Sequence, residues 1–144
     1  MDALTLWQPW ATLVARGYKK LEIRTHRNYA GLLGRRIAIH AGMRWHGSGA
    51  DMARRYLARR GVGVQEIAEL LLAAREERGH VLATARVGDI RAMTREDEDA
   101  ALCDYDIGDV AYVLGMVVRL AAPVPAKGSQ GRWQWHPPLD EEAG

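Results

Sequence analysis

The chain has 144 residues, of which 48% are hydrophobic and 26% are charged, and this balance is typical of one soluble globular domain. A chain of this length buries roughly 70% of its unfolded surface, so it can fold without metal or disulfide bonds. Cys103 is the single cysteine, which excludes an internal disulfide and a cysteine-rich zinc site and favours a reducing cytoplasm. Because the sequence shows neither a secretion signal nor an apolar run of membrane-spanning length, we expect neither secretion nor a membrane span.

The formal net charge is only +2, so a field strong enough to attract a polyanion must come from clustered charges. Basic side chains crowd residues 16–44, whereas acidic side chains gather in residues 66–77, 96–109 and 140–142. The chain therefore carries a charge dipole whose basic end is its N-terminal third.

The first predicted elements are a short strand over residues 3–6 and a helix over residues 8–16. Gln8-Pro9 opens the helical pattern, and Gly17 supplies its end. Within this helix, one face carries Trp10, Leu13 and Val14.

Residues 19–25 alternate polar and apolar side chains, which predicts a strand. The alternation sends Lys20, Glu22 and Arg24 to the face opposite Leu21, Ile23 and Thr25. On this register Lys19 lies on the Leu21 side, unless a bulge or the start of the strand redirects it.

Further strands are predicted over residues 36–41, 81–87 and 109–119, with a last short strand around residues 133–135. Helical spacing predicts two helices, over residues 49–60 and 64–77, separated by Gly61 and Gly63. Short strands with inserted helices favour an α+β barrel of about five to six strands over a parallel doubly wound sheet. We expect one domain over residues 1–138, followed by an acidic tail over residues 139–144.

Two segments resemble the ASCH domain family. The run LTLWQPWATLVARGYKKLEIRT is similar to the family's opening, a strand followed by a QP helix and then G-x-K-x-x-E-x-R. Later, VPAKGSQGRWQW is similar to its closing P-x-K-G segment with an aromatic residue. The middle of the chain also resembles a human subgroup of small ASCH proteins overexpressed in endothelial cells. The matched positions are Gln8, Pro9, Trp10, Ala11, Gly17, Lys19, Glu22, Arg24, Pro125, Lys127, Gly128 and Trp133.

The resemblance implies a PUA-like mixed β-barrel with a covering N-terminal helix and a helical insert. It further implies a cleft between the first helix, the Lys-Glu-Arg strand and the late loop. The family includes nucleic-acid-binding members, so we expect RNA or a nucleotide-like ligand in a basic cleft, no cofactor, and a monomer. The expected ligand-binding residues are Trp7, Gln8, Pro9, Trp10, Lys19, Glu22, Arg24, Thr25, Lys127, Gly128 and Ser129.

Each part of this cleft also has a purely structural interpretation. Opposite charges hold Glu22 ionised and able to orient Lys19 or Arg24, but surface ion pairs produce the same pattern. Trp7 and Trp10 suit base stacking, and a tryptophan on a helix is also common in a core. Residues 127–131 form either a ligand-approaching glycine loop or an ordinary turn.

Neither the histidines nor the cysteine indicate a metal site. The histidines show no i, i+4 pairing around an acidic residue and no cysteine partner. His40 ends an apolar strand and is interpreted as a structural histidine, with a general base as the alternative. Cys103 lies in an acidic segment and is expected to be inert. The five histidines are His26, His40, His46, His80 and His136.

Some bacterial members of the family deacylate acetylcytidine, and one is reported to cleave RNA. In the deacylases a lysine acts with a threonine three residues later. Lys19 matches that lysine, but Glu22 occupies the threonine position, which counts against the same reaction. Catalytic candidates are therefore Lys19, Glu22 and His40. A metal-independent ribonuclease is the other enzymatic alternative, and a protein-interaction domain is the third. The ribonuclease set is Lys19, Lys127, Tyr18, His40 and Ser129.

Overall fold

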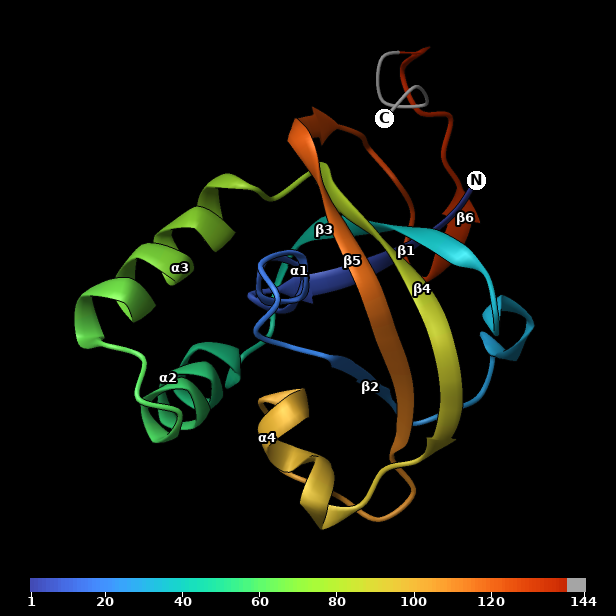
Figure 1. Cartoon of the computed structure of the whole chain (residues 1–144). Helices are drawn as coiled ribbons and strands as arrows, with labels where there is room; N and C mark the ends of the chain where they lie inside the picture. The colour runs from blue at the N-terminus through green and yellow to red at the C-terminus, as the bar shows by residue number, and fades with distance from the viewer. Residues whose placement is uncertain (140–144) are drawn as a thin grey trace.

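The computed structural model describes residues 1–139 (Figure 1). Within these residues, six strands and four helices follow one another, with short 3-10 turns at Ala30–Leu32 and Arg95–Asp97. The strands are β1 (Asp2–Gln8), β2 (Leu21–Arg24), β3 (Arg36–Trp45), β4 (His80–Ala92), β5 (Val110–Pro125) and β6 (Arg132–Gln134). The helices are α1 (Trp10–Ala15), α2 (Gly49–Arg59), α3 (Val64–Glu76) and α4 (Glu98–Ala101).

The strands form one mixed sheet in the order β2-β5-β4-β3-β1-β6. Strands β1 and β3 are parallel, and every other pair is antiparallel. The sheet curls into a half-barrel, helped by three register shifts between the long strands β4 and β5 (Figure 1). This architecture confirms the predicted α+β barrel class.

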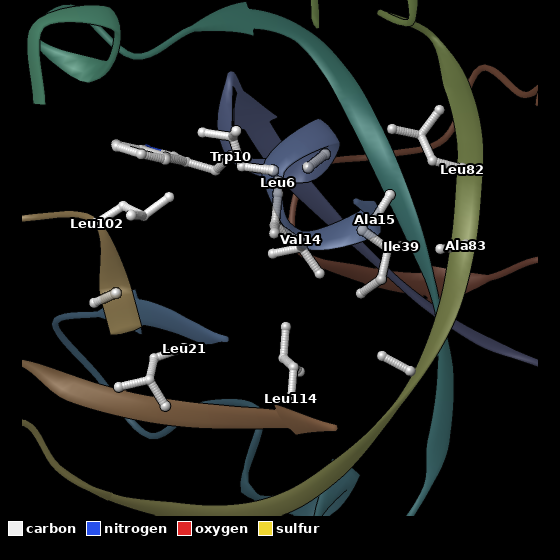
Figure 2. Packing of buried hydrophobic residues seen from close by; sticks show 14 of the residues in the cluster. Leu6, Trp10, Val14, Ala15, Leu21, Ile39, Leu82, Ala83, Leu102 and Leu114 are labelled. Atoms are coloured by element: carbon white, nitrogen blue, oxygen red, sulfur yellow. The ribbon is translucent and has the colours of Figure 1, made fainter. Parts of the chain in front are cut away.

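Helix α1 lies inside the curl, and all six of its residues are buried. Trp10 and Val14 of this helix lie among Leu21, Ile39 and Leu114 of the sheet (Figure 2). The helix is thus a core element packed on every side. It is also shorter than predicted, because Gln8 ends β1 and Pro9 precedes the first helical turn.

The two predicted insert helices are confirmed, and both lie on one side of the sheet (Figure 1). By contrast, the strand predicted over residues 19–25 begins only at Leu21. The backbone before it turns to the C-terminus of α4, where Lys20 N donates to Ala100 O over 2.8 Å. Helix α4 itself was not predicted, because four residues are too few to show a helical period. Residues 140–144 of the expected tail lie outside the described residues.

None of the helices within residues 1–139 combines the length and the apolar character that a membrane crossing requires.

The corner between β1 and α1 is organised by the side chain of Gln8, which is fully buried. Its Nε2 donates to Thr12 Oγ1 over 2.7 Å and to Ala74 O of α3 over 2.9 Å. Its Oε1 accepts from Thr12 N over 3.0 Å, and Thr12 Oγ1 donates to Glu77 over 2.7 Å. Gln8 therefore joins β1, α1 and α3 through hydrogen bonds within the protein.

We predict that Gln8→Leu lowers the free energy of unfolding by about 2 to 4 kcal/mol, because it leaves buried partners on Thr12 and Ala74 without hydrogen bonds. Urea denaturation followed by circular dichroism measures the change. The matched control is Gln130→Leu, at an exposed loop position. Equal stabilities of the two variants would contradict the anchoring role.

Candidate functional site

A pocket of about 350 Å³ opens beside α1 and β2. This volume lies in the range of small-molecule sites. The wall is built from four separate parts of the chain, which meet only in the folded molecule. The lining residues are Trp7, Trp10, Lys19, Glu22, Ile23, Arg24, His46, Met52, Cys103, Asp104 and Asp109.

Lys19 supplies a buried amine to this pocket and is only 2% exposed. Its Nζ donates to Ala101 O at the end of α4 and lies 4.4 Å from the ring centroid of Trp10. No ion pair joins Lys19 to any residue within 1–139. Burial lowers the pKa of Lys19, and the smaller effects of Cys103 and Glu22 oppose that change. Lys19 lies before the strand, so the strand alternation does not govern its direction.

Glu22 provides the carboxylate of the pocket and is 5% exposed. Its Oε2 accepts from Arg24 Nε over 2.9 Å, while Arg24 Nη2 donates to Thr5 O over 3.0 Å. The guanidinium also lies over Tyr29, 5.5 Å from the ring centroid. Within residues 1–139, Oε1 of Glu22 has no hydrogen-bond partner, so an oriented acceptor is available to a ligand.

Aromatic rings form another wall of the pocket. Trp10 is buried, whereas Trp7 is 39% exposed at the rim. The His46 ring lies 5.7 Å from Trp10 and 6.5 Å from Trp7, centroid to centroid. Burial, followed by the charge of Lys19, lowers the pKa of His46, so this ring is neutral at pH 7. The Arg44 guanidinium lies over the Trp7 ring, 5.5 Å from its centroid.

The charge of the lining differs from the basic cleft that was expected. Lys19 and Arg24 contribute two positive charges, and three carboxylates also line the pocket, which gives a net charge of −1 with His46 neutral. Two of these acids, Asp104 and Asp109, come from the segment that follows α4. Asp104 is paired with Arg55 of α2, whose Nη2 donates to its two carboxylate oxygens over 3.0 and 2.9 Å, so its charge is offset from outside the pocket.

The late loop does not join the pocket through its side chains. Lys127 is exposed and is not among the lining residues. Gly128 has φ +64, and a Cβ there would lie 2.6 Å from Cε1 of His40, so only glycine fits this contact. Ser129 contributes its backbone oxygen, which accepts from Thr5 Oγ1 over 2.6 Å.

His40 anchors the late loop, residues 126–129, by hydrogen bonds. Its Nδ1 lies 2.9 Å from Thr5 Oγ1 and its Nε2 lies 2.8 Å from Ala126 O. Trp133 Nε1 also donates to Thr5 Oγ1 over 2.9 Å. Burial lowers the pKa of His40, in spite of the opposing hydrogen bond to Ala126. His40 therefore holds β1, β3 and the loop together and does not line the pocket.

The structure thus separates the predicted residues into two groups. Those that line the pocket are Trp7, Trp10, Lys19, Glu22 and Arg24. Those that do not are Gln8, Pro9, Thr25, His40, Lys127, Gly128 and Ser129. Thr25 is exposed beyond the end of β2, and Pro9 is buried against Gly49.

Sequence reasoning did not assign His46, Met52, Asp104 or Asp109 to the site, because no motif connects these residues to the Lys-Glu-Arg strand. Cys103 also lines the pocket. Burial raises the pKa of its thiol, which agrees with the expected lack of reactivity.

A family model of the ASCH domain matches residues 4–112. The chain belongs to the ASCH domain family. The crystal structure of ASCH from Zymomonas mobilis matches with a TM-score of 0.54 and 12% identity, covering 99% of this chain and 90% of that one. The S-to-A mutant of that Zymomonas mobilis protein matches with a TM-score of 0.53 and 13% identity, covering 99% and 91%. At these identities the likeness shows the shared PUA-like fold.

No curated protein matches the chain. The finer resemblance to the endothelial subgroup has no support in these comparisons.

Because the amine of Lys19 is buried, we predict that the free energy of unfolding changes with pH in the alkaline range. The pKa of Lys19 in the folded chain lies below its usual 10.5, so between the two values the unfolded chain binds more protons. The contribution of Lys19 to stability therefore rises with pH across this window. We expect the stability of the parent relative to Lys19→Met to increase with pH between neutral pH and 10.5, as measured by urea denaturation. Exposed Lys20→Met is the control, and parallel curves for parent and Lys19→Met would contradict burial of this amine.

Proposed function

We propose that this ASCH domain binds nucleic acid, with single-stranded RNA or a nucleotide as the ligand, by taking one unstacked base into the pocket. The observation that carries this proposal is the buried Glu22 carboxylate, with one oxygen held by Arg24 and the other free. A fixed carboxylate accepts hydrogen bonds from the amino groups of bases. Membership of a nucleic-acid-related family supports the same ligand class.

The charge distribution favours a base inside the pocket and phosphates outside it. The buried carboxylate of Glu22 disfavours a phosphate beside it inside the pocket. Trp7 offers a partly exposed ring on which a base can stack, an interaction worth roughly 1 to 3 kcal/mol. Exposed Arg44 lies over the same ring and is placed to meet a phosphate at the rim.

A metal-independent hydrolase acting on RNA or a modified nucleoside is the second candidate. It rests on Lys19, a buried amine whose pKa is lowered by burial, because a lowered pKa favours the neutral form that can accept a proton. Glu22 lies in the same pocket and is the second catalytic candidate. The wider ribonuclease set has less support, because Tyr18, His40, Lys127 and Ser129 do not line the pocket.

Glu22→Gln separates binding from catalysis. The substitution keeps the shape and an acceptor oxygen but removes the charge that strengthens a hydrogen bond from a base amino group, so a pure binding module loses affinity for single-stranded RNA. A catalytic carboxylate behaves differently, because its loss lowers turnover by roughly 10² to 10⁴ while affinity persists. The measurements are RNA affinity and release of cleaved RNA or deacylated nucleoside in chelator-treated buffer. Parent turnover that Glu22→Gln abolishes would overturn the binding-module proposal.

Salt dependence tests where the phosphates lie. For single-stranded RNA, log affinity falls with log salt by about 0.7 per neutralised phosphate. We expect Arg44→Ala to reduce this slope by about one contact, whereas Trp7→Ala lowers affinity by roughly 1 to 3 kcal/mol without changing the slope. Lys127→Ala is the control cation outside the pocket. A slope that responds to Lys127→Ala but not to Arg44→Ala would place the RNA backbone on the late loop instead.

A further inference from the structure

A second hollow, of about 410 Å³, lies between α2 and α3 and shares no lining residue with the first pocket. Its walls are mainly apolar, and it contains two arginines and no acidic residue. The lining residues are Trp45, Ala50, Arg54, Ala58, Val64, Ile67, Ala68, Leu71, Leu72 and Arg75. The pair of helices stands on one side of the sheet (Figure 1).

The hollow exists because the two helices present side chains of different size. Helix α2 contributes the small residues Ala50 and Ala58, whereas α3 contributes larger apolar side chains. Trp45 lines the hollow beneath Arg75, whose guanidinium is 5.4 Å from the ring centroid. A side chain from outside can therefore enter between the helices and meet an apolar floor.

The α3 wall of the hollow carries an exposed apolar ridge. Val64, Ala68 and Leu72 are spaced four residues apart, which places them in one row along the helix. Val64 is 87% exposed and Leu72 is 56% exposed. Contiguous exposed apolar surface on a small domain is a common mark of an interaction site.

The ridge is followed by an acidic row on the outer side of α3. Glu69 and Glu76 are exposed, and neither forms an ion pair with any residue within 1–139. The hollow next to them carries Arg75 and Arg54, and Arg54 also pairs with exposed Asp51 over 3.1 Å. One face of α2 and α3 thus presents a hollow with a ridge along its α3 wall, and acids beside arginines.

We propose that the hollow is occupied by the α3 ridge of a second copy of this chain, in a two-fold symmetric dimer. A two-fold interface uses the same patch on both subunits, so the patch must be complementary to itself. This patch meets that requirement in shape, because Leu72 of each copy can enter the partner's hollow. The patch is also self-complementary in charge, because the acidic row of one copy faces the arginines of the other. The proposal replaces the expectation of a monomer and is independent of the ligand in the first pocket.

Sedimentation equilibrium of the full chain, from about 1 μM to about 1 mM, tests the dimer directly. The expected result is a mass that rises with concentration from 16.0 kDa toward twice that value. Leu72→Glu places a charge in the apolar contact and is expected to weaken dimerisation by about tenfold or more. The matched control is Leu33→Glu, at a leucine that is 54% exposed elsewhere on the surface.

Two charge variants test the pairing. Arg54→Glu with Arg75→Glu makes the hollow acidic, and Glu69→Arg with Glu76→Arg makes the outer row basic. Each variant alone then sets like charges against each other and stays monomeric. Mixed one to one, they restore opposite charges at both halves of the interface, so a heterodimer forms. Circular dichroism and thermal unfolding confirm that each variant is folded before mixing.

Three results would overturn the second-copy proposal. The first is a parent that stays monomeric throughout the concentration range, even if it binds a synthetic acidic amphipathic helix in the hollow. The second is a dimer that Leu33→Glu weakens as much as Leu72→Glu does. The third is a mixture of folded charge variants that remains monomeric.

Discussion

The buried amide of Gln8 is the interaction on which much of this domain depends. A primary amide removed from water must pair its donors and its acceptor within the protein, and Gln8 does so with Thr12 and Ala74. That requirement fixes the N-terminal turn of α1 against the last turns of α3. The neighbouring Pro9 packs on Gly49, where a Cβ would lie 2.7 Å from the proline ring, so α2 begins at the same corner. Both insert helices are therefore held by one dipeptide.

The same corner also positions the aromatic side of the pocket. Trp7 precedes Gln8 and Trp10 follows Pro9, so the fixed turn holds both rings toward one cavity. A glutamine in a binding motif can act by touching a ligand or by holding the residues that do. Here the hydrogen bonds of Gln8 are all internal, and the motif shapes the site through its neighbours.

Elements with clear periodicity could be predicted from the sequence. The insert helices have apolar residues at helical spacing, with Gly61 and Gly63 between them, and β3 has a continuous apolar run. Trp7, Trp10, Lys19, Glu22 and Arg24 line one cavity. These residues are close in sequence, so a local strand and helix are enough to bring them together.

The remaining walls could not be predicted, because they depend on contacts between distant segments. Asp104 and Asp109 reach the pocket only because the last carbonyls of α4 bond to the chain around Lys19 and Lys20. Four helical residues give no periodic signal of this docking. Likewise, Lys127 sits in a loop whose position is set by its backbone contacts to Thr5 and His40. The charge of Lys127 does not indicate the direction in which its side chain points.

The buried pair of Lys19 and Glu22 sets what the pocket can hold. With Lys19 protonated the lining has a net charge of −1, and with Lys19 neutral it becomes −2. The Glu22 carboxylate disfavours a phosphate beside it in either state, and Arg55 offsets Asp104, whereas a base can donate to Glu22 and accept from Lys19 without bringing charge. Since hydrogen bonding to the charged form raises the pKa of an amine, a base that accepts from Lys19 also favours its protonation. If the pocket binds a base as proposed, protonated Lys19 donates a hydrogen bond to the base, whereas neutral Lys19 can accept a proton. A bound base shifts the protonation equilibrium of Lys19 toward the charged form, which recognises the base.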